Sequence, residues 1–239
     1  MKYPDGSLGL KNVSLTIKRG DKVVLMGCNG SGKSSLFLTL AGVLKPDIGE
    51  YVINGEQFRY CKKQRQRLCQ IIGYVFQDPD VQVVSSHVNE DVAFGLRNMG
   101  LKENEVQARV SKYLHLTGIS ELKEKAIHTL SYGQKKQVAL AGVLAMEPQV
   151  IMLDEPFAWL DYRQTQRLRR ILDELSEQGK TLIVSTHDSE FAFEWGQQAL
   201  VMKDGELKAN MLVKDVLNNE SLVKDLDIAP LSVRRQLQV

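Results

Sequence analysis

The chain has 239 residues, of which 43% are hydrophobic and 25% are charged, and this composition supports one large domain with a sizeable core. Lys and Arg outnumber Asp and Glu by only 31 to 29, so the overall charge points neither to nucleic acid nor to an anionic membrane surface as a partner. No apolar run reaches the ~18 residues of a membrane-spanning helix, and the first ten residues lack the apolar core of a secretion signal, so we expect a soluble, cytosolic chain.

The first third of the chain predicts strands, a helix and further strands. Residues 12–17 (NVSLTI) alternate apolar and polar side chains and reach a turn at Arg19-Gly20, which predicts a hairpin leading into the apolar strand 22–26. Residues 34–43 carry leucines and a valine at helical spacing and predict a helix. The basic run 61–67 (CKKQRQR) is typical of a solvated helix face. Two further strands are predicted at residues 50–55 and 71–76.

Between about residues 88 and 127 the pattern becomes helical, with Val106, Val110 and Leu114 at four-residue steps, and predicts an inserted helical subdomain. The alternation of strands and helices then resumes with a helix from Gly133, a strand at 150–153, a helix around 168–175, a strand at 181–185 and a hairpin at 203–206. Such alternation predicts a mostly parallel sheet with helices on both faces.

The strongest chemical signal is GCNGSGKSS, which fits G-x-x-x-x-G-K-[ST], follows an apolar strand and opens a helix. Its glycines let successive N–H groups point at a β-phosphate, while the helix N-terminus adds positive potential. Lys33 then bridges β- and γ-phosphate oxygens, and the Ser34 hydroxyl ligates Mg²⁺. A glycine-rich turn without a ligand is the alternative, and the complete context argues against it. The predicted ATP-binding residues are Gly27, Cys28, Asn29, Gly30, Ser31, Gly32, Lys33, Ser34 and Ser35.

Two carboxylates follow the apolar run VIML, where that strand emerges at the carboxyl edge of the predicted sheet. Asp154 is positioned there to hold Mg²⁺ through its water shell, and Glu155 to orient and deprotonate an attacking water. The alternative is that the two acidic residues are only buried or cap a helix, and the complete phosphate loop argues against it.

Two more polar residues, Gln77 and His187, end apolar strands. An amide can touch Mg²⁺ or the attacking water and rotate away, and an imidazole can donate a hydrogen bond to the γ-phosphate. Each alone is more often a strand cap. Together they predict a composite triphosphate site.

A second phosphate-shaped segment, LSYGQ, occupies residues 130–134. Ser131, the N–H of Gly133 and Gln134 lie at the start of a predicted helix, whose positive end would point at a γ-phosphate approaching from outside. The alternative is an N-cap serine followed by an amphipathic helix, which explains Ser131 but not the Gly-Gln pair.

These segments, with WLD at 159–161, resemble in order and spacing the nucleotide-binding subunit of ATP-binding cassette (ABC) transporters over nearly the whole chain. Residues 73–82, 89–101 and 130–148 further resemble the energy-coupling-factor group, whose ATPases drive uptake of vitamins or of nickel and cobalt ions. The resemblance implies an α/β P-loop NTPase (RecA-like) fold with a mostly parallel sheet core, an antiparallel β subdomain and an inserted α-helical subdomain. It implies a single domain over 1–239: a core of 1–87 and 148–215, a helical signature subdomain of 88–147, and a short tail of 216–239 without a large regulatory domain.

The resemblance also implies how the residues are used. Two subunits, identical or homologous, face each other head to tail, and each lends its LSYGQ segment to the ATP that the other holds. The residues acting in trans are then Ser131, Tyr132, Gly133, Gln134 and Asp161. Tyr3 stacks on adenine, and the cofactors are ATP and Mg²⁺, the latter held by Ser34, Gln77 and Asp154. The catalytic residues are Glu155, His187 and Gln77.

The membrane partners follow from the same resemblance. Gln77 lies beside a groove that receives a short helix of a transmembrane coupling protein, which works with a substrate-binding membrane component, while the ATPase sits at the cytoplasmic face of the membrane. Several residues depart from the family pattern: Tyr132 replaces the more usual glycine and must point away from the phosphates, and Gln137 stands where many relatives have arginine. Trp159 and Phe157 are bulky for their segment.

The sequence thus predicts a Mg-dependent ATPase that energises micronutrient uptake. Nickel or cobalt is the leading substrate, and a vitamin importer or a non-energy-coupling-factor importer or exporter remains the alternative. A P-loop kinase has no use for LSYGQ, a DNA-repair ATPase of the superfamily carries a long coiled coil, and translation-associated relatives usually hold two such domains.

Overall fold

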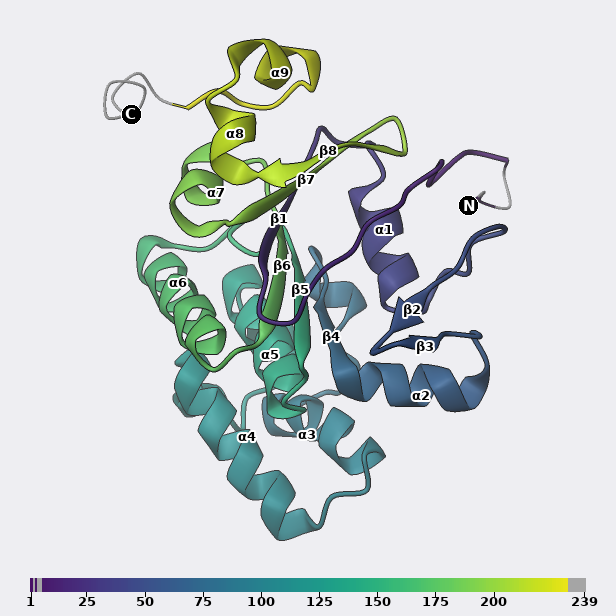
Figure 1. Ribbon diagram of the computed structural model, residues 1–239. Coiled ribbons are helices and arrows are strands. Elements are labelled where there is room, and N and C mark those ends of the chain that lie inside the picture. Colours follow the sequence, from purple (N-terminus) through teal and green to yellow (C-terminus); the bar gives the residue numbers. More distant parts are fainter. Residues whose placement is uncertain (2, 4–5, 232–239) are drawn as a thin grey trace. The chain divides into compact units, whose positions relative to one another are not determined.

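The computed structural model (Figure 1) describes residues 1, 3 and 6–231. Its chain divides into two compact units. The first unit contains the chain up to Leu68 and again from Thr181, and the second contains Cys69–Lys180. The predicted C-terminal tail is described up to Leu231, and residues 232–239 lie outside the described part.

Strand β1 (Lys22–Met26) is central to the sheet of the first unit, where it runs parallel to both of its neighbours. These neighbours are β6 (Thr181–Ser185) and β7 (Gln198–Lys203), and β8 (Glu206–Leu212) pairs antiparallel with β7. The predicted hairpin before β8 is confirmed. Because β1 and β6 are parallel, with Val23 opposite Ile183, both strands end at the same edge of the sheet.

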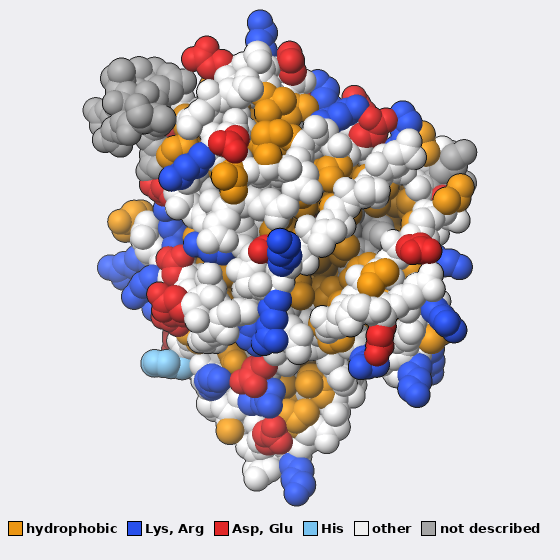
Figure 2. Space-filling view, viewed as in Figure 1, with side chains coloured by type: hydrophobic (Ala, Val, Ile, Leu, Met, Phe, Trp, Pro, Cys, Tyr) orange, Lys and Arg blue, Asp and Glu red, His pale blue; other side chains and the backbone are white. Residues whose placement is uncertain are grey.

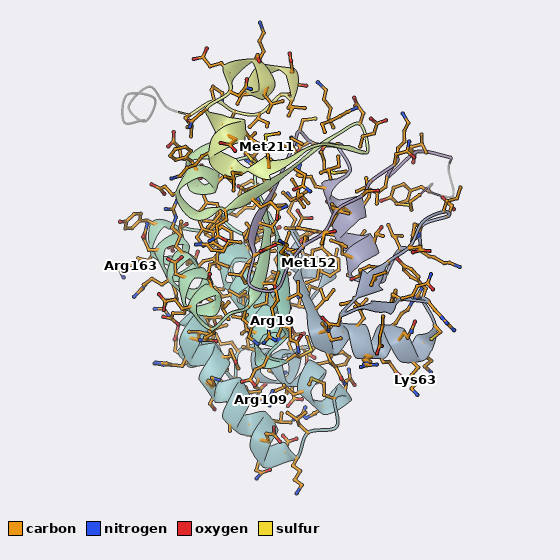
Figure 3. All side chains as sticks on the ribbon, viewed as in Figure 1. Arg19, Lys63, Arg109, Met152, Arg163 and Met211 are labelled. Carbon is orange, nitrogen blue, oxygen red and sulfur yellow. The ribbon has the colours of Figure 1, made fainter. Side chains whose placement is uncertain are left out.

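The apolar runs of these strands explain their central position. Val23, Val24 and Leu25 of β1 are fully buried, as is Leu182 of β6, which is the pattern of strands covered on both faces. The helices that the structure describes in this unit are α1 (Lys33–Leu40), α2 (Lys62–Ile71, which continues past the unit boundary), α7 (Ser189–Trp195), α8 (Val213–Leu217) and α9 (Glu220–Asp225). In α2 only Leu68 is buried, and Lys63 points outward (Figure 3), so the predicted solvated helix face is confirmed.

A small antiparallel pair completes the first unit. Strands β2 (Val52–Ile53) and β3 (Glu56–Gln57) join through Asn54-Gly55, whose φ angles of 50° and 80° suit a two-residue hairpin turn. The strand predicted at residues 50–55 is therefore shorter than expected. Among the described residues, this pair represents the antiparallel subdomain.

The strand predicted at residues 12–17 is wrong, because no strand is present there. Its apolar side chains, Val13, Leu15 and Ile17, are half-buried and the polar ones between them are exposed, so the alternation did sort the side chains. A strand also needs a neighbour for its backbone, and no segment of the described chain forms a ladder with this one. The predicted turn at Arg19-Gly20 is present, with Gly20 at a φ of 84°.

The second unit combines a parallel strand pair with a helical region. Strands β4 (Ile72–Val75) and β5 (Val150–Asp154) are parallel, with Val75 opposite Leu153. The longer helices described are α3 (Val88–Asn98), α4 (Glu103–Thr117), α5 (Tyr132–Ala145) and α6 (Tyr162–Glu177). One 3-10 turn, η1 (Pro79–Val81), precedes α3, and two more, η2 (Ser120–Leu122) and η3 (Ile127–Thr129), lie between α4 and α5. The helical region predicted between residues 88 and 127 is confirmed.

Helix α5 packs against both α3 and α4 (Figure 1), and most of its side chains are buried. Its small residues, in the run ALAGVLA, allow the neighbouring helices to approach closely. Met152 of β5 is likewise fully buried within the strand layer of this unit (Figure 3). On the face drawn in Figure 2, acidic and basic side chains are interspersed, in keeping with a net charge of +2.

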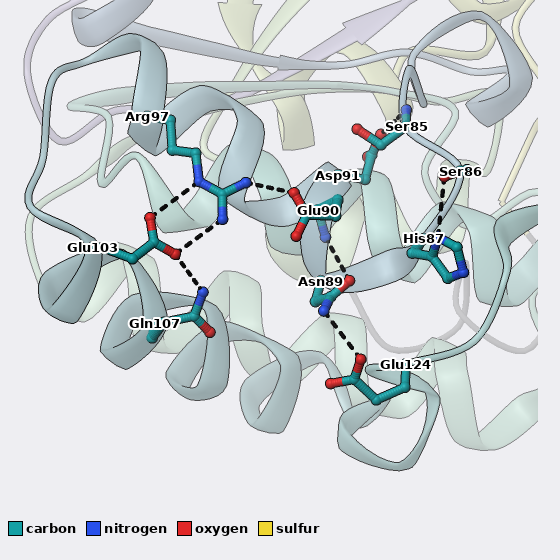
Figure 4. A network of polar contacts seen from close by, with 10 residues as sticks. All are labelled: Ser85, Ser86, His87, Asn89, Glu90, Asp91, Arg97, Glu103, Gln107 and Glu124. Atoms are coloured by element: carbon teal, nitrogen blue, oxygen red, sulfur yellow. Dashed lines mark hydrogen bonds and ion pairs between the residues drawn. The ribbon is translucent and has the colours of Figure 1, made fainter.

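A polar network links α3 to α4 at the surface of the second unit (Figure 4). Arg97, at the end of α3, donates to Glu103 at the start of α4 over 2.9 Å and to Glu90 over 2.5 Å. The hydrogen bonds from Arg97 and Gln107 lower the pKa of Glu103 to about 2. This pair therefore ties the first turn of α4 to α3.

We expect Arg97→Met to destabilise the protein only where Glu103 is ionised. A carboxylate with a lowered folded-state pKa stabilises the fold above its unfolded pKa of about 4.3, and loses that effect as the pH falls toward 2. The difference in melting temperature between parent and variant, followed by circular dichroism, should therefore be present at pH 6 and shrink steadily below pH 4. Lys63→Met, which removes an exposed charge on α2, controls for net charge; a difference independent of pH would refute the role of this pair.

Candidate active site

The loop between β1 and α1 requires glycine at two positions. Gly27 has a φ of 139°, and a Cβ there would lie 2.2 Å from the carbonyl oxygen of Met202. Gly32 has a φ of 103°, and a Cβ there would lie 2.8 Å from the carbonyl oxygen of Gly9. A side chain at either position would meet backbone atoms and be strained at that φ angle, so the tight return of the loop depends on these two glycines.

Positive charge is concentrated inside this loop. Lys33 is only 8% exposed, and its Nζ donates to the carbonyl oxygens of Gly27 (2.8 Å) and Cys28 (3.0 Å). Helix α1 begins at Lys33 with no acidic residue in its first turn, so its positive end faces the same loop. Ser31 Oγ is buried without a hydrogen-bond partner among the described residues. An ammonium, a helix N-terminus and an unpaired hydroxyl fit a bound phosphate group.

Two other predicted residues lie near this loop in the first unit. The hydroxyls of Tyr3 and Ser35 are hydrogen-bonded at 2.8 Å, which places the half-buried Tyr3 beside the start of α1. The backbone N–H of Thr186 donates to the carbonyl of Leu25 over 3.2 Å, so the exposed His187 follows at the edge where β1 ends. The structure thus brings Tyr3, residues 27–35 and His187 to one side of the first unit.

The carboxylates of Asp154, which ends β5, and Glu155, which follows it, lie in the second unit, and both residues are buried. Asp154 is 4% exposed and accepts a hydrogen bond of 3.2 Å from the hydroxyl of Tyr74 on β4. Burial, and then the nearby carboxylate, raise the pKa of Tyr74, which keeps it a donor. Sequence reasoning missed Tyr74, although the strand alternation offered a signal: it pairs with Met152, which shares a face with Asp154.

Glu155 is 9% exposed and adopts a φ of +44°, in the left-handed region that few non-glycine residues occupy. Its carbonyl oxygen accepts a 2.7 Å hydrogen bond from Lys136 Nζ, which also donates to the carbonyl of Ala158 over 3.0 Å. Burial lowers the pKa of Lys136 to about 8, while Glu155 and Asp154 oppose that shift, so the side chain remains mainly protonated at neutral pH. Lys136 was also missed; its place on the buried stripe of α5, four residues before Leu140, was the available signal.

The start of α5 is a capping box. The N–H of Gln134 donates to Ser131 Oγ over 3.3 Å, and the N–H of Ser131 donates to Gln134 Oε1 over 2.9 Å. The interpretation of Ser131 as an N-cap is therefore confirmed. Gly133 packs against α6, because a Cβ there would lie 2.7 Å from Gln164 Oε1. This contact supplies a structural reason for the glycine.

Tyr132 turns toward other segments of its own unit. Its hydroxyl donates to the carbonyl oxygen of Gln77 over 3.3 Å, and its ring meets that of Trp159 edge-on at 6.2 Å between centroids. The side chain of Gln77 is exposed just beyond β4. The bulky residue at position 132 thus lies against the Gln77 segment.

Asp161 caps α6 in a second capping box. The N–H of Gln164 donates to Asp161 Oδ1 over 2.8 Å, and Gln164 Oε1 accepts from the N–H of Asp161 over 3.0 Å. Gln164 also donates to Gln137 over 3.2 Å, and Gln137 donates to the carbonyl of Thr117 at the end of α4 over 2.9 Å. Gln137 therefore bridges α6 and α4 from α5.

Residues 10–158 match the protein family described as ABC transporter. The chain belongs to the ABC transporter family. The energy-coupling factor transporter ATP-binding protein EcfA2 of Methanospirillum hungatei is 43% identical over 222 residues, covering 93% of this chain and 56% of that relative. The chain thus spans little more than half of that relative's length. EcfA of Methanothermobacter thermautotrophicus is also 43% identical over 222 residues, covering 93% of this chain and 71% of the relative. This ABC ATPase is of the energy-coupling-factor type.

Solved structures of ABC ATPases agree with the fold. CbiO1 of Clostridium perfringens, described as part of the ABC transporter complex cbiONQ, has a TM-score of 0.81 and 39% identity, covering 100% of this chain and 96% of that one. The ATP-binding cassette MJ0796, solved as a dimer in a post-hydrolysis state with ADP and Pi, has a TM-score of 0.80 and 30% identity, covering 86% and 90%. The P-loop fold expected from the resemblance is confirmed.

We expect nucleotide to protect the thiol of Cys28 from alkylation. Cys28 is exposed on the phosphate loop, where a bound triphosphate would cover it, whereas the exposed Cys61 and Cys69 lie on α2 or just before it and should react unchanged. Mass spectrometry after timed iodoacetamide treatment, with and without MgATP, should show slower labelling of Cys28 alone. Equal labelling of Cys28 under both conditions would contradict the assignment of this loop.

Proposed function

We propose that this protein is the ATP-hydrolysing subunit that energises micronutrient uptake through an energy-coupling-factor transporter. The observation that carries the proposal is the phosphate loop, where the buried ammonium of Lys33 and the positive end of α1 face a turn that depends on Gly27 and Gly32. Membership in the ABC transporter family supports the same chemistry.

The proposed mechanism assigns phosphate binding, metal binding and proton transfer to different residues. Lys33 and the N–H groups of the loop bind the β- and γ-phosphates, and His187 donates a hydrogen bond to the γ-phosphate. Ser34, Asp154 and Gln77 would hold Mg²⁺, which when bound neutralises negative charge on the phosphate oxygens. The hydrogen bond from Tyr74 orients the Asp154 carboxylate.

Glu155 acts as the general base: its carboxylate takes a proton from the attacking water, whose oxygen then bonds to the γ-phosphorus as the bond to ADP breaks. Glu155 is only 9% exposed in the single chain. Tyr3 stacks on the adenine.

Two subunits are proposed to share each ATP. Ser131, Tyr132, Gly133, Gln134 and Asp161 of one subunit then approach the γ-phosphate held by the other, led by the capped N-terminus of α5. The dimeric structure of the similar MJ0796 cassette supports this arrangement. Since ADP lacks the γ-phosphate, hydrolysis would loosen the pair.

The membrane partners are proposed to be a transmembrane coupling protein and a substrate-binding component. Large apolar side chains of the second unit stand exposed around and beyond the Gln77 segment, namely Val81 (67%), Val84 (64%) and Phe94 (50%), and they suit a partner helix. Within the described residues, no helix has both the length and the apolar character needed to cross a membrane. We propose that the protein lies at the cytoplasmic face of the membrane, where the partner helix binds these apolar side chains.

Nickel or cobalt ions are the proposed cargo, on the resemblance of residues 73–82, 89–101 and 130–148. Uptake of labelled nickel, cobalt and B vitamins, measured in cells with and without the gene, tests this choice. Loss of vitamin uptake alone would reassign the cargo while leaving the ATPase role intact.

We expect Glu155→Gln to retain ATP binding, slow turnover by at least about 100-fold, and accumulate an ATP-bound dimer. The amide keeps the shape of the side chain but cannot accept the proton. Steady-state phosphate release and light scattering after size exclusion with MgATP check the two effects, and Glu177→Gln on the exposed end of α6 is the matched control. Turnover at the parent rate would remove Glu155 from its role, and a variant that stays monomeric with MgATP and its partners would refute the shared site.

A further inference from the structure

The loop that follows β5 holds an unusual backbone. Glu155 and Trp159 adopt φ angles of +44° and +67°, although neither is glycine. Such conformations persist only where the surrounding structure holds them. Within the loop, the N–H of Ala158 donates to the carbonyl of Glu155 and that of Leu160 to the carbonyl of Phe157, both over a long 3.3 Å. Both distances exceed the usual N–H···O range of about 2.7–3.2 Å.

Lys136 supplies much shorter contacts to the same loop. Its Nζ lies 2.7 Å from the carbonyl oxygen of Glu155 and 3.0 Å from that of Ala158, so a single ammonium spans the turn. The donor is charged and the residue only 5% exposed, conditions under which hydrogen bonds are strong and an unmade one is costly. Because both acceptors are backbone carbonyls, Lys136 constrains the path of the main chain.

Packing leaves the loop room to move. A cavity of about 30 Å³ borders Lys136, Pro156 and Leu160. Without the ammonium, the turn could shift toward this space. The Lys136 ammonium therefore constrains where the backbone of Glu155 lies.

We propose that Lys136 is a positioning residue for the general base: it clamps the carbonyl groups of Glu155 and Ala158 so that the Glu155 carboxylate is presented to the attacking water. This inference rests on the proposed function of Glu155. It assigns to the helix that follows LSYGQ a second task, which is to hold the catalytic loop of its own chain.

The chain offers a matched control at the other end of β5. Lys180 Nζ also donates to two backbone carbonyls, those of Glu147 (3.2 Å) and Pro148 (2.7 Å), just before the strand begins. Lys136→Met and Lys180→Met thus remove the same chemical contact from opposite ends of β5. Both variants should lower the melting temperature, but only Lys136→Met should affect the chemical step.

The first measurement is steady-state ATPase activity of the full chain. We expect Lys136→Met to lower kcat about 10- to 100-fold, since small displacements of a catalytic group cost rate on that scale, with KM for ATP unchanged. Lys180→Met should leave both constants at parent values. Parent-like kcat in Lys136→Met, or an equal loss in Lys180→Met, would overturn the proposal.

A double-mutant cycle separates positioning from general damage. In a Glu155→Gln background no base remains to be positioned, so adding Lys136→Met should leave the residual single-turnover rate unchanged. A further loss as large as in the parent would overturn the proposal. An active Glu155→Gln would instead refute the proposed function, whereas an inactive Glu155→Gln beside a fully active Lys136→Met would refute only this inference.

The third measurement is fluorescence anisotropy, which does not depend on ATPase activity. The chain has two tryptophans, so Trp195→Phe leaves Trp159, 78% exposed and one residue beyond Ala158, as a reporter of the loop. Loss of the clamp should lower the fluorescence anisotropy of Trp159 in Lys136→Met and leave it unchanged in Lys180→Met. If Lys136→Met does not fold, Lys136→Gln serves in all three measurements, and unchanged anisotropy together with parent-like kcat in that variant would overturn the proposal.

Discussion

Helix α5 packs on α3 and α4, and its long polar side chains all lie in its first two turns. Four side chains in those turns contact other segments of the second unit. The contacts run from Tyr132 to Gln77, from Lys135 to Asp80, from Lys136 to Glu155 and from Gln137 to Thr117. Because the rest of the helix is buried, all of these segments are held against the same firmly packed helix. The second unit therefore holds Glu155, the proposed general base, and its Gln77 segment against the same helix.

These contacts give a physical route for the proposed transport cycle. If the N-terminus of α5 meets a γ-phosphate held by a second subunit, any displacement of the helix is passed to the Gln77 carbonyl through Tyr132 and to the Glu155 carbonyl through Lys136. The first contact leads to the segment that the membrane partner is proposed to touch. The second leads to the base that ends the ATP-bound state. Binding and hydrolysis would thus act on the same helix.

The sequence predicted the parts of the site whose chemistry is local. The phosphate loop is nine consecutive residues, and Asp154 ends its strand, so their spacing was enough to predict them as site residues. Lys136 escaped because its acceptors are backbone carbonyls 19 and 22 residues away, and a carbonyl leaves no trace in the sequence. The strand predicted at 12–17 failed for a related reason, since alternation reports which side chains are buried but not whether a partner strand exists. Helix α7, with seven residues, was too short to show a period, although Asp188 caps it.

Two departures from the family pattern explain one another. Tyr132 replaces a usual glycine, and Trp159 is bulky in a loop where its backbone takes a left-handed conformation. Their rings meet edge-on, so each large side chain gains a neighbour that a small residue would not provide. Trp159 nevertheless stays 78% exposed, because Tyr132 covers only one side of it. A glycine at position 132 would therefore remove both the hydrogen bond to Gln77 and the aromatic contact that supports Trp159, so these two positions act as a pair that joins the start of α5 to the loop beyond Glu155.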